Sequence, residues 1–203
     1  MKLSAASPKE IALGAALGAV GAAIFLFAFP AGSISTLVHD VLRLPGPGAG
    51  IALVFGPFLV FVVLLSSLVT QANGEALIAA LAFGISCTLL VHAFGVRTGP
   101  AGAFGSLLFL AAVVALGLAV EVVLVVGRAF PRAWHCVLAG CVANAVLLVF
   151  YWLVIFPRTA SWVRWKDLPL LMGICLVGGL LAGYLVWLVS QPLSRALALR
   201  QKE

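Results

Sequence analysis

Charged residues are the scarcest part of this sequence. Only 9% of its 203 residues are charged, and only 6 are acidic. A soluble domain of this length needs much more charge on its surface, and a disordered or collagen-like chain needs a different composition. Hydrophobic residues instead make up 64% of the chain, and the mean hydropathy is +1.24. The sequence therefore predicts an all-α, polytopic integral membrane protein.

Sequence motifs of catalysis are also missing. The chain contains no Gly-rich phosphate loop, no HExxH and no GxSxG pattern, and no set of nucleophile, base and orienting group that a hydrolase needs. The cysteines lack metal-site spacing and lie in apolar runs, where we expect small core side chains: Cys87, Cys136, Cys141 and Cys175. We expect a protein that is not an enzyme and that holds no cofactor and no metal.

Six apolar runs are long enough to cross a membrane, since about 20 apolar residues span the hydrocarbon layer. Lipid offers no partners to backbone groups, so each run is predicted to be a helix. Ser7 and Pro8 before the first run are typical of a helix start. That run can itself span the membrane, so we expect no cleaved signal sequence. The prediction is one domain over residues 1–203, with spans at about 11–29, 51–70, 76–94, 104–126, 134–156 and 168–190.

The basic residues set the predicted orientation. In a soluble protein a net charge of +6 would suggest a nucleic-acid partner, but here the basic residues lie in short loops, and we expect none. The side with both termini holds Lys2, Lys9, Arg128, Arg132, Arg195, Arg200 and Lys202. The other side holds Arg43, Arg97, Arg158, Arg164 and Lys166. The excess of positive charge predicts that both termini are cytoplasmic.

The connection between the first two spans is longer than a turn. Its first part is predicted to form an amphipathic helical turn or two, with Leu37, Val41 and Leu44 on the apolar face. A run of Pro and Gly then prevents the helix from continuing. At membrane depth such a segment has to be buried in protein or line a cavity. We predict that it is a gating loop, formed by Pro45, Gly46, Pro47, Gly48 and Gly50.

The first span is rich in small residues four positions apart. Gly14 and Gly18 form one such pair, and Ala15, Ala19 and Ala23 form another series. Small residues at this spacing let a second helix approach closely. Almost every face of the span is small, which favours an interface with a partner subunit at Ala15, Ala19 and Ala23. The alternative is ordinary packing within the bundle.

Polar and aromatic residues gather on the predicted outer side. Arg binds anions and stacks on rings, and Trp offers a stacking surface, so these residues could line a ligand cavity. The alternative for the Trp residues is anchoring at the membrane interface. The predicted ligand-binding residues are His92, Arg97, Asn144, Trp162 and Trp165.

Glu121 is the acidic residue that lies well inside an apolar run. Ionisable groups are costly in hydrocarbon and often mark an ion or proton site. Glu121 also lies near the predicted cytoplasmic end of its span, so an interfacial or partner-facing carboxylate is the alternative. His39 and His92 share one predicted depth and could hold haem, or each could form ordinary hydrogen bonds.

The layout resembles the substrate-binding (S) component of an energy-coupling factor (ECF) transporter. The likeness rests on the Ala/Gly faces of the first span and on Leu-Pro-Gly-Pro-Gly-Ala-Gly-Ile at 44–51, which runs on to Phe-Gly-Pro-Phe at 55–58. It implies a loop that closes over a small, vitamin-like ligand. It also implies that Ala15, Ala19 and Ala23 dock on a transmembrane coupling subunit driven by cytoplasmic ATPases, in a prokaryotic cell (inner) membrane.

Two other functions fit the same sequence. The chain could be a non-catalytic subunit of a larger membrane complex, with Ala/Gly faces that serve assembly. It could also be a small intramembrane enzyme or haem protein that uses His39, His92 or Glu121. A pocket under the first loop is predicted only for substrate capture.

Overall fold

A computed structural model describes residues 6–28, 31–46, 48–70, 72–95, 104–126, 132–159 and 164–200. Within these ranges the chain is helical, and six helical segments are long and apolar enough to cross a membrane. This confirms the predicted all-α fold with six spans.

The spans lie close to the predicted positions. They are α1 (Pro8–Ala28), α3 (Gly56–Thr70) preceded by the π-helix η2 (Ile51–Phe55), α4 (Glu75–Phe94), α5 (Leu107–Val126), α6 (Arg132–Phe150) continued by the π-helix η5 (Tyr151–Ile155), and α7 (Leu168–Arg200). Four short segments connect them: α2 (Ala31–Ser35), the π-helix η1 (Thr36–Val41), and the 3-10 helices η6 (Phe156–Thr159) and η7 (Trp165–Asp167).

Local hydrogen bonds explain where the helices begin. The Ser7 amide donates to Glu10 Oε2 at 2.7 Å and the Glu10 amide to Ser7 Oγ at 3.4 Å, so the predicted cap is a capping box. The fourth span begins at Leu107 rather than at 104, because Ser106 Oγ accepts the Phe109 amide at 3.1 Å and caps the helix there. The sixth span continues past the predicted residue 190 to Arg200, through Pro192.

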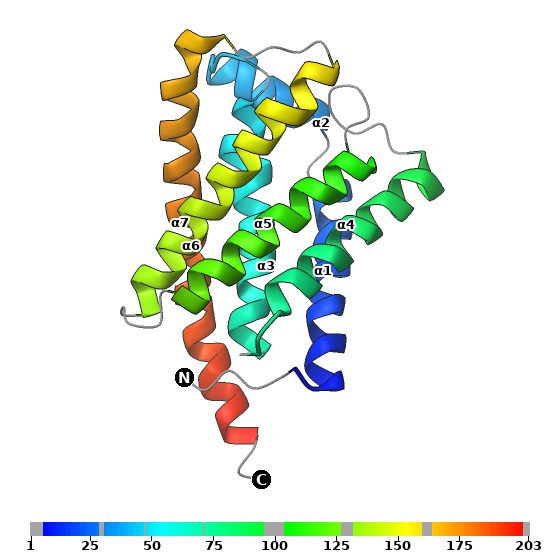
Figure 1. Cartoon of the computed structure of the whole chain (residues 1–203), viewed down its shortest axis with the longest axis vertical. Helices are drawn as coiled ribbons and strands as arrows, with labels where there is room; N and C mark the ends of the chain where they lie inside the picture. Colours follow the sequence, from blue (N-terminus) through cyan, green and yellow to red (C-terminus); the bar gives the residue numbers. More distant parts are fainter. Residues whose placement is uncertain are drawn as a thin grey trace.

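The helix α3 lies in the middle of the bundle. It contacts α1, α4, α5, α6 and α7, and those five form a row around it in the order α1, α4, α5, α6, α7. Figure 1 shows α1 at one side and α7 at the other, with α3 between them. The helix α1 therefore stands at an end of the row.

Glycines bring neighbouring helices into backbone contact. A Cβ atom on Gly18 of α1 would overlap the Ala79 carbonyl oxygen of α4 and lie 3.0 Å from the Phe83 amide nitrogen. A Cβ atom on Gly179 of α7 would overlap the Gly140 carbonyl oxygen of α6. Lipid does not drive helices together, so these close contacts supply the van der Waals energy that does.

Phenylalanine rings fill the space between α1, α3, α4 and α5. The Phe25 ring lies at the centre, and its centroid is 5.1 to 6.4 Å from those of five neighbouring rings. Edge-to-face pairs dominate, which is the arrangement that aromatic quadrupoles favour. The five neighbours are Phe55, Phe58, Phe83, Phe104 and Phe109.

The helical segment after α1 forms as predicted, but only part of its predicted apolar face packs on the bundle. Leu44 is half-buried against the core, whereas Leu37 and Val41 are 43% and 65% exposed and Val38 is fully buried. The prediction assumed 3.6 residues per turn. Residues 36–41 form a π-helix, whose wider turn changes which side chains share a face.

Candidate functional site

A polar pocket of about 380 Å³ lies between the loop after η1 and the residues that precede α7. Figure 1 shows the start of α7 at the end of the bundle opposite the start of α1. Pro45 and Gly46 of the predicted gating loop line one side, and Arg164, Lys166 and Asp167 line the other. The loop and the last interhelical connection thus meet at a cavity large enough for a small solute.

Main-chain and side-chain hydrogen bonds shape the loop. The Leu44 amide donates to the Val38 carbonyl at 3.0 Å, and His39 Nδ1 lies 3.0 Å from the Leu44 carbonyl oxygen. Gly46 has φ of 77°, a left-handed conformation that glycine adopts without a steric cost. Arg43 has φ of 52° without that freedom, so the loop conformation carries some backbone strain.

The far end of the loop is inserted between helices. Gly48 and Ala49 are buried. A Cβ atom on Gly48 would lie 3.2 Å from Leu148 of α6 and 3.6 Å from Phe156 and Leu171. Gly50, the last predicted gate residue, is half-buried and leads into η2. The loop therefore lies closed against α6, η6 and α7, while Pro47 is outside the described residues.

The charges at the pocket favour an acidic or polar solute. Arg164 and Lys166 are both exposed, and the Asp167 amide donates to the Arg164 carbonyl at 2.9 Å, which holds the turn. No ion pair joins Asp167 to either cation among the residues that the structure describes. Two cationic side chains beside one carboxylate leave the pocket with net positive charge.

Of the predicted ligand residues, the three that the structure describes do not line this pocket. His92 is exposed on α4, and its Nδ1 lies 2.8 Å from the Thr88 carbonyl oxygen of the preceding turn. Trp165 is 78% exposed and packs edge-on against Trp152 with centroids 4.9 Å apart; it follows Arg164 but does not line the cavity. Arg97 and Trp162 lie outside the described residues.

Asn144 joins three helical segments. Its side chain is fully buried, and Nδ2 donates to the Ala52 carbonyl of η2 at 3.1 Å and to the Cys175 carbonyl of α7 at 2.7 Å. Gly56 passes against the Asn144 amide oxygen, where a Cβ atom would collide. Asn144 therefore links η2, α6 and α7 to one another below the loop.

Glu121 caps a neighbouring helix. Its Oε1 accepts the Gly74 amide at 2.7 Å and its Oε2 accepts the Ala76 amide at 3.3 Å, so the carboxylate lies at the N-terminus of α4. A carboxylate there satisfies two amides and interacts favourably with the helix dipole. The carboxyl group without a hydrogen-bond partner is instead that of Glu75, which is fully buried.

Sequence reasoning assigned no site role to Glu75, Lys166 or Asp167, and Lys166 entered only the count of basic residues for orientation. All three stand at the ends of apolar runs, where charges are ordinary, so composition carries no signal for them. Their roles depend on which segments lie opposite in the folded bundle. The nearest signal was the basic and aromatic character of residues 158–167.

The small residues of α1 divide between two faces. Gly14, Gly18, Gly21 and Ala22 are buried, and Gly14, Gly18 and Gly21 lie against α3 and α4. The predicted partner residues Ala15, Ala19 and Ala23 are half-buried at the edge of this face. Ala12 and Ala16 are exposed. The side of α1 that faces away from the bundle thus carries Ala12 and Ala16 together with larger exposed side chains, among them Val20 and Ile24.

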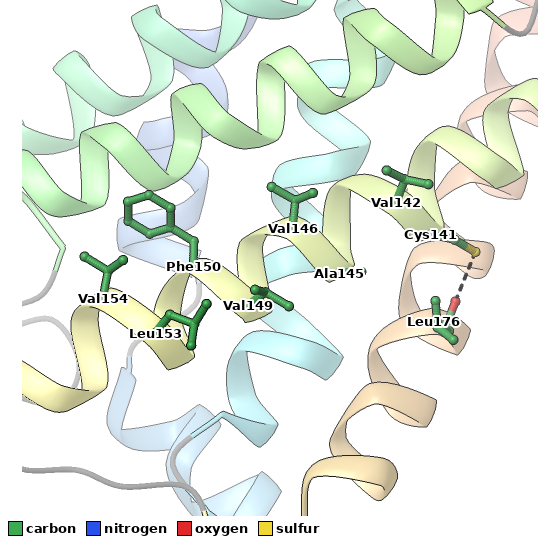
Figure 2. Close-up of a pocket in the computed structure, with 9 residues that line it drawn as sticks. All are labelled: Cys141, Val142, Ala145, Val146, Val149, Phe150, Leu153, Val154 and Leu176. Carbon is green, nitrogen blue, oxygen red and sulfur yellow. Dashed lines mark hydrogen bonds between the residues drawn. The ribbon is translucent and has the colours of Figure 1, made fainter.

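A second hollow lies on α6 and is apolar (Figure 2). It measures about 480 Å³, and its one polar group, the Cys141 thiol, donates to the Leu176 carbonyl at 3.4 Å. A groove without free polar groups on a membrane-spanning helix suits a lipid chain rather than a specific solute. The lining residues in Figure 2 are Cys141, Val142, Ala145, Val146, Val149, Phe150, Leu153, Val154 and Leu176.

Comparison with known proteins gives a likeness of structure. The sequence matches no family model and no curated protein. A solved crystal structure of an S-component of an ECF transporter superposes with a TM-score of 0.69, over 94% of this chain and 86% of that chain, at 21% sequence identity. The layout resemblance noted in the sequence thus extends to the arrangement of the helices. The chain has the fold of an S-component of an ECF transporter.

Proposed function

We propose that this chain is the substrate-capture subunit of a small-molecule importer. The observation that carries the proposal is the polar pocket between the closed loop and the start of α7. The fold shared with an ECF S-component places the chain among proteins of that architecture. On this proposal the chain binds a solute, works without catalysis and lies in a prokaryotic cell membrane with both termini in the cytoplasm.

The loop would act as the gate. It is held by buried Gly48 at one end and by the His39 contact with Leu44 at the other, with Pro45 and Gly46 over the cavity. Release of Gly48 from Leu148, Phe156 and Leu171 would open the pocket to the outer solution. Arg164 and Lys166 would hold the solute through charge-assisted hydrogen bonds.

A thermal-stability screen tests the pocket. A solute that binds only the folded chain raises its unfolding temperature by mass action, so a panel of small acids and neutral solutes should contain a stabilising member. Arg164→Ala and Lys166→Ala should each weaken its affinity by about tenfold, the effect of losing a hydrogen bond to a charged group. Lys9→Ala, at the opposite end, is the control and should change nothing. Equal affinity in all variants would rule out this pocket.

The free side of α1 supports docking on a transmembrane partner subunit. This helix stands at an end of the row and contacts α4 and α3, and no other helix of the described residues packs on its exposed side. Ala12 and Ala16 on that side, with Ala19 and Ala23 at its edge, would let a partner helix approach closely near the start of α1. The exposed Val20 and Ile24 would pack against that partner farther along the helix. The partner would be a coupling subunit that carries cytoplasmic ATPases.

Docking is tested by a larger side chain on the exposed side of α1. Ala16→Leu should leave the isolated chain folded but abolish co-purification of a partner subunit, because the added side chain would separate the two helices. Ala111→Leu makes the same change at an exposed position of α5 and should keep the partner. Loss of the partner in both variants, or in neither, contradicts docking through α1.

A further inference from the structure

The most unusual polar group of the bundle is the side chain of Glu75, in the first turn of α4. Its exposed fraction is 0%, and neither carboxyl oxygen has a hydrogen-bond partner in the described part of the chain. Burial of a carboxyl group without a partner is unfavourable, and the ionised form is far more costly to bury than the neutral one. Uptake of a positive charge would offset this cost.

A second unpartnered group points to the same place. Ser66 of α3 is 0% exposed, and its hydroxyl oxygen has no hydrogen-bond partner. A Cβ atom built on Gly14 of α1 would collide with Glu75 Oε2 and lie 3.3 Å from Ser66 Oγ. The carboxyl and the hydroxyl therefore converge beside Gly14, between α1, α3 and α4.

The acidic neighbours are already engaged. Glu121 accepts the Gly74 and Ala76 amides, and Glu10 accepts the Ser7 amide. The negative charges of Glu10 and Glu121 both act on Glu75. The negative charges around Glu75 thus favour binding of a positive charge there. Among the described side chains, the Glu75 carboxylate and the Ser66 hydroxyl are left to bind it.

We propose that Glu75 and Ser66 bind one monovalent cation, either an alkali metal ion or a proton. A divalent ion such as Ca²⁺ takes six to eight oxygen ligands, commonly with more than one carboxylate. Among the described residues no group of three or more His, Cys, Asp and Glu side chains could hold such an ion. The single available carboxylate matches a single positive charge.

The site lies at the end of the bundle where α1 begins, opposite the polar pocket (Figure 1). The cation would approach past the turn at Asn73 and Gly74, which are exposed and half-buried. Because Gly14 closes one side, occupancy stabilises the contact of α1 with α3 and α4. This inference does not depend on the proposed import function.

The test uses the full chain in lipid nanodiscs. The unfolding temperature is measured against NaCl, LiCl and KCl at constant ionic strength, balanced with choline chloride, and separately against pH. Glu75→Gln removes the charge with little change in shape. Asp40→Asn removes an exposed carboxylate on η1, at the other end of the bundle, and is the matched control.

If the occupant is an alkali ion, one salt raises the unfolding temperature of the wild type and Asp40→Asn saturably, with no such effect in Glu75→Gln. If it is a proton, the salts act alike, and stability falls with rising pH in the wild type and Asp40→Asn but not in Glu75→Gln. Ser66→Ala should shift the midpoint about tenfold in cation concentration or about one pH unit, and it decides the matter if Glu75→Gln does not fold. Responses to salt and pH that are unchanged in the folded variants would overturn the proposal.

Discussion

At the scale of single residues, buried polar side chains hold the helices together. Asn144 donates to main-chain carbonyls of η2 and α7, and Glu121 accepts two main-chain amides at the start of α4. In lipid an unpaired polar group has no water to bind, so each of these contacts fixes a helix position. Asn144 fixes the position of η2 below the loop. Glu121 fixes the start of α4, where Glu75 lies.

Asn144→Asp should destabilise the chain more than Asn144→Leu. Leucine removes the two hydrogen bonds, at a cost of about 1 kcal/mol for interhelical bonds in membranes. Aspartate keeps the shape but directs a carboxylate, which has no donor when ionised, at the Ala52 and Cys175 carbonyls. Thermal unfolding in detergent measures both variants. An aspartate variant as stable as the wild type would contradict the assigned contacts.

Glu121→Ala should lower the free energy of unfolding by about 1–2 kcal/mol, the effect of losing a helix cap. Glu121→Gln should cost less, because its amide oxygen still accepts one of the two α4 amides. Hydrogen exchange at Gly74 and Ala76 gives a local readout, and we expect faster exchange there in the alanine variant. Unchanged exchange at both amides would show that the cap does not form.

These two residues show how far sequence can predict the buried polar groups. An acidic residue inside an apolar run identified Glu121 as unusual, but its partners lie 47 and 45 residues away, on an adjacent helix. Nothing in the sequence places Ser66 beside Glu75, because that contact depends on how α1, α3 and α4 pack. Polar roles inside a bundle need the packing as well as the pattern.

At the scale of elements, the two sides of α1 have different surroundings. Gly14, Gly18 and Gly21 pack against α3 and α4, whereas Ala12 and Ala16 face away from the bundle. Hydropathy located this helix because length and apolar character are visible in the sequence. Which small residues face inward was not visible, since glycine and alanine occur on almost every face.

Gly18→Leu should therefore have the opposite effect to Ala16→Leu. The Gly18 variant pushes α1 off the Ala79 carbonyl of α4 and should unfold or strongly destabilise the isolated chain. The Ala16 variant should keep the wild-type unfolding temperature and lose only its partner. Similar stability of the two variants would mean that the packing face of α1 is assigned wrongly.

The loop after η1 gives a second test at this scale. Gly48→Val adds a Cβ atom and two methyl groups where a Cβ atom alone would lie 3.2 Å from Leu148, so the loop should no longer insert fully. We expect faster release of the solute that stabilises the wild type, with little loss of helix content by circular dichroism. A release rate equal to that of the wild type would exclude loop insertion as the gate.

At the scale of the whole molecule, three features occupy separate places around α3. The polar pocket lies at one end, the Glu75 site at the other, and the free side of α1 at the edge of the row. The sequence predicted the six spans and the loop over the pocket, because both depend on local composition. It could not predict that Arg164 and Lys166 line the same pocket as Pro45, because these segments are more than a hundred residues apart in the chain.

Native mass spectrometry of the chain extracted gently in its own membrane lipids tests solute capture most directly. The account predicts a small solute bound to the wild type and absent from the Arg164→Ala, Lys166→Ala double variant, with a coupling subunit and ATPases lost in Ala16→Leu. A solute-free wild type, held stoichiometrically among unrelated large membrane subunits, would contradict the account and make α1 an assembly surface.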